Sequence, residues 1–432
     1  MHELTRIIKD DMAIALGVTE PGAIAFCAAK ARSLIGGELI ALEIAMNSGL
    51  YKNADTCCIP NSSAFGSAHA AALGYVAGDP EKGLNSLAGA TPQDDALARR
   101  YVKEGRVRAV LKGISSRIFI QARLETTAGS AEVTIRDAHT NIVRMAVNGE
   151  AIWESASAAA ADEGKEVETH RIHTYTLKAL LDYVDAVPGE EIAFVMEAYR
   201  VNLALFEAGL HSPKTSFANR LLAMNGGNVI SQNERLTASL LCNAAIEARV
   251  MGVPKPAMSI TGSGAHGIIA TLPLYAVYRI NNLTEERLCR ATMLSYLVCT
   301  YIKEYSGRLS AFCGCGIAAG TGMALALCYL KGGNLAAMGR ALNNMASSIT
   351  GMICDGGNQG CVMKGVAACS VAFDSAEFAL SGVSVESIHG INGATPEATM
   401  RNIGRIAFPG MTHTEETILE IQREKAEGAH PE

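Results

Sequence analysis

The chain has 432 residues, of which 49% are apolar and only 5% aromatic, and its formal net charge is −6. This length exceeds one ordinary hydrophobic core, so two or three structural units are expected. The charges are spread along the chain, which excludes the clustered basic face of a nucleic-acid-binding protein.

The start of the chain and its cysteines predict a cytoplasmic location. The first ten residues are too charged for the apolar part of a signal peptide. Twelve cysteines in such a chain are expected in a reducing compartment, as metal ligands or small buried hydrophobes rather than in disulfides.

The first 85 residues are predicted to form helices and loops. Ala23 to Leu34 is an alanine-rich helix that carries Cys27, with Pro21 at its entry. A polar loop is expected from Asn47 to Ser63, and a second helix from Ser67 to Val76.

Strand patterns begin after residue 115. Apolar and polar residues alternate from Arg117 to Glu125, and a turn at Ala128-Gly129 leads into a second strand. A third strand, Ile142 to Val147, ends in Asn148-Gly149, a strong hairpin signal.

Helical patterns return after a polar stretch from Glu154 to Thr169. They cover Tyr175 to Val184 and Glu190 to Leu210, and almost all of Ser216 to Phe373 between glycine loops. We therefore predict an α+β fold with a mostly helical catalytic body, residues 1–85 and 195–432. A smaller inserted α+β unit with an antiparallel sheet is expected at residues 86–194.

Two long apolar stretches resemble membrane spans. They are Ala257 to Tyr278 and Ala311 to Leu330. The second contains no charged residue, and the first contains only His266. Because glycines and polar residues interrupt both, we expect buried core helices and no membrane contact.

Four cysteines stand in glycine-rich loops and carry the strongest chemical signal. Cys313-Gly-Cys315 is followed about forty residues later by Cys354 and Cys361, which bracket Asp-Gly-Gly-Asn-Gln-Gly. Thiolates on open backbone suit a soft metal or an iron–sulfur cluster, and three protein ligands leave one iron of a cubane free for substrate. The alternative is that all four are small buried residues. The spacing is not that of a zinc knuckle.

The remaining cysteines are interpreted as packing residues. Cys57 and Cys58 are adjacent and point in divergent directions, and Cys27 alone on its apolar helix is a core residue. The others lie in apolar helical patterns: Cys242, Cys289, Cys299, Cys328 and Cys369.

A second glycine-rich loop runs from Ser259 to Gly267 and opens onto an apolar helix. Its small hydroxyls and free N–H groups suit a carboxylate or phosphate, and His266 could orient a ligand. Lys52 lies in the polar Asn47 to Asn53 segment, where a lysine is ordinarily solvated. It would contact a ligand only if this segment folds over the two glycine-rich loops.

Five segments together resemble the L-cysteine desulfidase family, which is related to the alpha part of iron–sulfur-dependent L-serine dehydratases. The resemblance spans nearly the whole chain in the same order, over Glu20-Pro-Gly-Ala-Ile-Ala-Phe-Cys27, Asn47 to Pro60, Thr261 to Gly267, Cys313 to Gly320 and Cys354 to Cys361.

The resemblance implies a [4Fe–4S] cluster with three cysteine ligands and no pyridoxal phosphate. Cys354 and Cys361 carry over as ligands, with Cys313 favoured over Cys315 as the third. Cys27 falls at the position of a proposed catalytic base.

A carboxylate cradle is also implied. It comprises Lys52, Asn53, Thr261, Ser263 and His266. The expected substrate is a small amino acid, and the expected reaction is β-elimination from L-cysteine to pyruvate, ammonia and hydrogen sulfide. L-Cysteine is preferred since soft iron favours sulfur as the leaving atom. The alternatives are an L-serine dehydratase and a non-enzymatic thiol-rich protein. A homodimer remains an open expectation.

Overall fold

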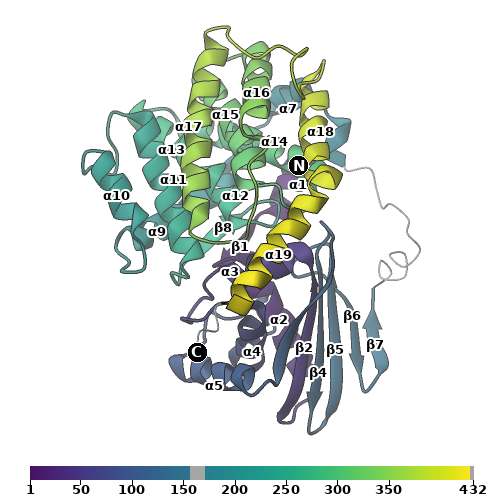
Figure 1. Ribbon diagram of the computed structural model, residues 1–432. Helices are drawn as coiled ribbons and strands as arrows, with labels where there is room; N and C mark the ends of the chain where they lie inside the picture. The colour runs from purple at the N-terminus through teal and green to yellow at the C-terminus, as the bar shows by residue number, and fades with distance from the viewer. Residues whose placement is uncertain (156–170, 429–432) are drawn as a thin grey trace.

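The computed structural model describes residues 1–155 and 171–428, which form a sheet unit and a helical body packed against one another (Figure 1). Most of the polar stretch expected at 154–169 lies outside the described residues. The sheet unit contains β2 (Leu39–Asn47), β3 (Val107–Gly113), β4 (Phe119–Thr126), β5 (Gly129–Arg136), β6 (Ile142–Val147) and β7 (Glu150–Glu154), with α2 (Thr19–Leu34), α3 (Ser48–Thr56), α4 (Ser67–Ala77), the short turn η1 (Gly83–Asn85) and α5 (Pro92–Lys103).

The helical body holds most of the remaining elements. Its helices are α1 (Glu3–Asp11), α7 (Leu177–Ala186), α8 (Gly189–Ile192), α9 (Met196–Leu210), α10 (Phe217–Met224), α11 (Glu234–Val250), α12 (Gly264–Ile269), α13 (Leu272–Ile280), α14 (Glu285–Ser306), α15 (Gly320–Leu330), α16 (Leu335–Ile349), α17 (Gly360–Leu380), α18 (Pro396–Arg405) and α19 (Thr412–Gly428). The short turns η2 (Arg171–Thr174), η3 (Ala193–Val195), η4 (Cys315–Ala319) and η5 (Ile406–Gly410) connect them, and β1 (Ala13–Leu16) pairs antiparallel with β8 (Pro256–Ser259).

The six-stranded sheet has the order β3-β2-β4-β5-β6-β7. The predicted alternation appears in β4, where Ile120, Ala122 and Leu124 are buried against the helices that cover one face. The hairpin predicted at Asn148-Gly149 joins β6 to β7. The α+β, mostly helical fold class is confirmed.

Two details of the predicted architecture are corrected. The sheet is mixed rather than antiparallel, because β2 and β3 pair in parallel. The stretch before residue 85 is not only helix and loop, since β2 lies between β3 and β4, and α3 occupies the first half of the expected polar loop. A boundary at residues 85 and 86 therefore separates β2 from strands to which it is hydrogen-bonded.

Helices α2 and α4 cross closely because Gly74 has no side chain. A Cβ on Gly74 would lie 2.4 Å from the Ala25 Cα and from its carbonyl oxygen. We expect Gly74→Ala to force the helices apart and to lower the free energy of unfolding by about 1–3 kcal/mol. Gly36→Ala is the matched control, because nothing lies within 4 Å of its added Cβ. Thermal unfolding measures both, and equal midpoints for the two variants would contradict the packing account.

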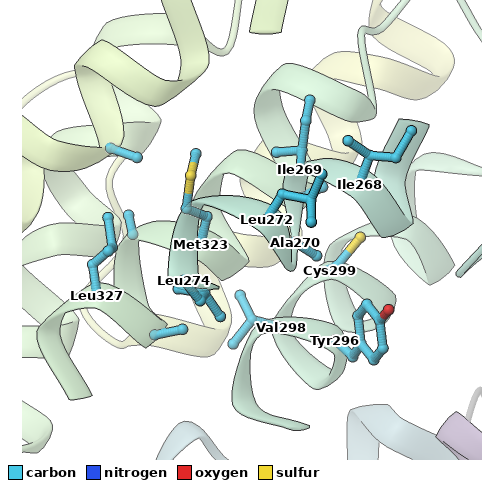
Figure 2. Packing of buried hydrophobic residues seen from close by; sticks show 14 of the residues in the cluster. Ile268, Ile269, Ala270, Leu272, Leu274, Tyr296, Val298, Cys299, Met323 and Leu327 are labelled. Atoms are coloured by element: carbon cyan, nitrogen blue, oxygen red, sulfur yellow. The ribbon is translucent and has the colours of Figure 1, made fainter. Parts of the chain in front are cut away.

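The helical body has a continuous apolar core. Figure 2 shows side chains from α12, α13, α14 and α15 meeting there, among them Ile268, Leu274, Val298 and Met323. The two membrane-like stretches form these short buried elements, which are apolar because protein surrounds them. Among the described residues, no helix is both long and apolar enough to cross a bilayer.

Helix α19 returns from the helical body to the sheet unit and lies against α3 (Figure 1). The amide of Gln422 donates to the carbonyl of Asp355 at 2.9 Å. The C-terminal helix therefore contacts the cysteine-bearing loop between residues 354 and 361.

Candidate active site

The two cysteine-bearing loops lie side by side. Phe312 and Ile353 form an isolated antiparallel bridge. The N–H of Cys313 donates to Met352 O at 3.0 Å, and the N–H of Cys354 donates to Ala311 O at 2.6 Å. This pairing brings Cys313 and Cys354 together although forty residues separate them in the chain.

Cys361 joins the same group of thiols from the first turn of α17. Its Sγ lies 3.5 Å from the carbonyl oxygen of Gly356, so the loop folds back beneath it. The pKa values of Cys315, Cys354 and Cys361 are each affected by the charge on Cys313, which shows that the four thiols are neighbours.

The thiols of Cys313 and Cys315 are hydrogen-bonded to each other. A hydrogen bond from Cys315 lowers the pKa of Cys313 to about 7, despite burial. The same hydrogen bond raises the pKa of Cys315 well above its usual value, and burial raises that of Cys361 to about 12. Thiolate is the form that binds metal.

The thiols are the metal-binding side chains of this region. In residues 1–155 and 171–428, no three His, Cys, Asp or Glu side chains are arranged to hold one metal ion. Thiolate ligands of a cubane stand about 6–7 Å apart and need not meet at one point. Cys354, Cys361 and one thiol of the Cys313/Cys315 pair are the residues that could hold such a group.

Asn53 connects the thiols to a buried carboxylate. Its Oδ1 lies 3.9 Å from Cys354 Sγ, and its Nδ2 donates to Glu20 Oε1 at 2.8 Å. Glu20 also accepts from the Thr19 hydroxyl at 2.9 Å. Asn53 thus lies between Glu20 and Cys354, and its expected role in binding the substrate carboxylate stays a prediction.

Lys52 is neither solvated nor free to bind a ligand. Its ammonium is fully buried, lies 2.6 Å from Glu415 Oε2 and donates to Ser310 O at 3.1 Å. The expectation that Lys52 contacts substrate is corrected on this ground: the ion pair fastens α3 to α19.

The loop before α12 faces several buried charges. The Thr261 hydroxyl and His266 Nδ1 are 2.5 Å apart. A Cβ on Gly264 would lie 2.7 Å from Arg249 Nε, and one on Gly262 would lie 3.2 Å from the His139 ring. Glycine at these positions lets the backbone approach both side chains.

Ser263 lies in the same loop, where its N–H donates to Ile260 O at 3.1 Å. The role of Thr261, Ser263 and His266 in binding a carboxylate stays a prediction.

Sequence reasoning missed five charged or ionisable residues of this region. They are Glu20, His139, Arg249, Lys303 and Arg308, of which the first four are buried. Arg249 and Lys303 end otherwise apolar helical patterns in α11 and α14, and a charge in such a position was an available signal. His139 lies in the turn between β5 and β6, where nothing in the sequence distinguishes it.

The assignment of Cys27 as catalytic base is corrected. Its thiol is fully buried between α2 and the sheet and donates to Val133 O at 3.4 Å. Burial raises its pKa to about 12, so at neutral pH it stays a protonated thiol, and the thiolate that would accept the proton is scarcely populated. Two helical turns, about 10 Å along the axis, separate it from Glu20 at the site.

The buried histidines predict a loss of stability in acid. Burial, with the charges of Lys303 and Arg249, lowers the pKa of His266 well below 6.5. Burial is also the largest effect on His139 and lowers its pKa. The charge of Glu20 raises this pKa, and the charges of Arg308 and Arg249 lower it further. In the unfolded chain both titrate near pH 6.5, so the unfolded state binds more protons below that pH.

The contribution of these two neutral histidines to the free energy of unfolding is therefore fully present above about pH 6.5. It is lost as the pH falls from there toward their lower pKa values in the folded state. Urea unfolding should give a smaller free energy at about pH 5 than at about pH 7.5, and a smaller difference in His266→Gln. An equal pH dependence in the variant and the wild type would contradict this role of His266.

A comparison with protein families identifies the chain. The family model described as serine dehydratase alpha chain matches residues 81–420. The chain belongs to this family.

Relatives share almost the full length of this member of the serine dehydratase alpha chain family. A UPF0597 protein of Clostridium botulinum is 38% identical over 426 residues, covering 98% of this chain and 99% of the relative. UPF0597 proteins of Desulfatibacillum aliphaticivorans and Caldanaerobacter subterraneus are each 36% identical, with 97% and 98% of both chains covered, respectively. Membership indicates a lyase-type enzyme of a family that in general depends on an iron–sulfur cluster, which agrees with the resemblance noted in the sequence.

Proposed function

We propose that the protein is a [4Fe–4S]-dependent lyase that converts L-cysteine to pyruvate, ammonia and hydrogen sulfide. The observation that carries the proposal is the convergence of Cys313, Cys315, Cys354 and Cys361 beside a buried group of charged side chains. A non-enzymatic thiol-rich protein would have no need for those buried charges, which are costly to fold around.

Cys313, Cys354 and Cys361 are the proposed cluster ligands. Cys313 is preferred to Cys315 because its backbone N–H pairs with Met352 O in the bridge that also holds Cys354, whereas Cys315 begins the turn η4. When bound, the cluster supplies an open iron that acts as a Lewis acid on the leaving group. The proposal requires no pyridoxal phosphate.

His139 is the proposed acceptor of the substrate's α-proton. It is buried beside Gly262, its Nε2 has no hydrogen-bond partner among the described residues, and its lowered pKa keeps it neutral at neutral pH. Removal of the proton leaves its electron pair to form the Cα–Cβ double bond as the Cβ–S bond breaks. The sulfur departs as sulfide, and the resulting aminoacrylate hydrolyses in water to pyruvate and ammonia.

L-Serine is the second candidate substrate, because the matching family carries the name of serine dehydratase. The same steps would release water in place of sulfide. We favour L-cysteine since soft iron binds sulfur more readily than oxygen.

Anaerobically purified protein tests the proposal. Brown protein should release sulfide and pyruvate in equal amounts from L-cysteine, with a lower kcat/KM for L-serine. Protein that carries a full complement of iron yet releases pyruvate from neither amino acid would reject the lyase proposal.

A further inference from the structure

Arg249 is a buried cation without a protein partner. It lies at the end of α11 and is 4% exposed. Across the part of the chain that the structure describes, its guanidinium has neither an ion pair nor a hydrogen bond, and Nε is buried without an acceptor. An unpaired buried guanidinium is costly, so such a group is expected to meet an anion that is not part of the fold.

The other cations of the site are already engaged. Arg308 pairs with Asp11 at 3.0 Å, and Lys303 donates to the carbonyl of Arg308 at 3.2 Å. Arg249 therefore stands apart from them as a group available to a ligand.

Glu20 presents the opposite charge under similar conditions. It is 5% exposed, and its carboxylate accepts hydrogen bonds from Asn53 and Thr19. Within the described residues no cation lies within 4.0 Å of it, so its charge is hydrogen-bonded but not neutralised.

The two charges lie in one region without touching. Val18 and Val250, close to Glu20 and Arg249 in the chain, pack together with Cys57. Glu20 raises the pKa of both His139 and Cys57, whereas Arg249 lowers both, so each charge acts on the same two groups.

The proposed cluster ligands border this region. Cys361 packs against the Val18, Cys57 and Val250 group, and Asn53 connects Glu20 to Cys354. A ligand held between the two charges would therefore have the thiols beside it.

We propose that Glu20 and Arg249 bind the two charged ends of a free α-amino acid, Glu20 its ammonium and Arg249 its carboxylate. The inference deepens the proposed function and rests on it for the identity of this region as the substrate site. A guanidinium binds a carboxylate through two parallel hydrogen bonds, which makes this end selective. The site would reject amines, amides and peptides, since each lacks one of the two charges or extends past it.

Binding of L-alanine tests the clamp without requiring turnover, since L-alanine has both charges and no leaving group. Calorimetry on anaerobically purified holoprotein should show binding to the wild type that is about 100-fold weaker in Arg249→Gln and in Glu20→Gln. Arg235→Gln is the matched control, because Arg235 lies on the same helix in a partly exposed pair with Asp374. It should bind L-alanine as the wild type does.

A comparison of ligands on the wild type needs no substitution. L-alaninamide, which lacks the carboxylate, should bind at least about 100-fold more weakly than L-alanine, and Arg249→Gln should lose this discrimination. The unliganded Arg249→Gln protein should unfold at the wild-type temperature or above it, since the substitution removes an unpaired buried charge.

Equal affinity of the wild type for L-alanine and L-alaninamide, or an Arg249→Gln protein with wild-type affinity for L-alanine, would overturn the inference. Absence of saturable L-alanine binding to the wild type would do the same. Binding that depends on Arg249 in a protein that releases no pyruvate would keep the clamp and reject the lyase proposal.

Discussion

Replacing Cys354 by alanine should remove the cluster and, as a consequence, the activity. Cys354 lies beside the bridge that joins the two cysteine-bearing loops, and its Sγ is 3.9 Å from Asn53 Oδ1. With one of three proposed ligands gone, iron content and brown colour should be lost, and sulfide release should fall at least about 1,000-fold. Iron analysis and the anaerobic sulfide assay measure both effects.

Cys328→Ala is the control for loss of a buried thiol. Cys328 lies on α15, where its Sγ faces the carbonyl of Ala376 at 3.9 Å. Its substitution should leave a small cavity and cost about 1 kcal/mol of stability, with iron and activity retained. A folded Cys354→Ala protein with wild-type iron and turnover would refute its role as a ligand.

Replacing His139 by glutamine should slow turnover while leaving the cluster in place. Loss of a general base lowers kcat by about 10²- to 10⁴-fold, and KM should change little because glutamine keeps a polar side chain at this position and the substrate's charged ends are bound elsewhere. In the wild type, kcat/KM should rise with pH through a pKa below 6.5, because only neutral His139 can accept the proton. Burial lowers the pKa of His139, Glu20 opposes that shift, and Arg308 and Arg249 add to it. The variant should lose this dependence.

Cys27→Ser provides the contrasting result for the same step. Because the Cys27 thiol lies against Val133 and away from the site, the serine variant should keep most of its activity and iron. Full activity in His139→Gln would remove His139 from the mechanism. An inactive but folded and iron-loaded Cys27→Ser protein would reinstate Cys27.

The sequence was most informative where a local pattern is sufficient. Alternation located β4, the Asn148-Gly149 turn located the β6–β7 hairpin, and glycine-flanked cysteines marked the loops that meet in the structure. It missed β2, whose Leu39–Asn47 segment becomes a strand through pairing with β3 and β4 on either side. Helix α3 was missed for a similar reason, since polar residues there are buried by contacts distant in sequence.

Local sequence patterns could not predict which charged residues meet at the site. Glu20 and Arg249 are more than two hundred residues apart, and tertiary contacts such as the packing of Val18, Cys57 and Val250 bring their segments into one region. The misassignment of Cys27 has the opposite origin. Its position in the chain agrees with the family, but the sheet that covers α2 turns its thiol into the core.

Mössbauer spectroscopy of ⁵⁷Fe-labelled, anaerobically prepared protein tests the central claim most directly. The account predicts about four irons per chain in a [4Fe–4S] cluster, one of which changes its signal when L-cysteine is added, because three cysteines leave that iron open. A spectrum without a cubane, or a cubane in which no iron responds to L-cysteine, would contradict it.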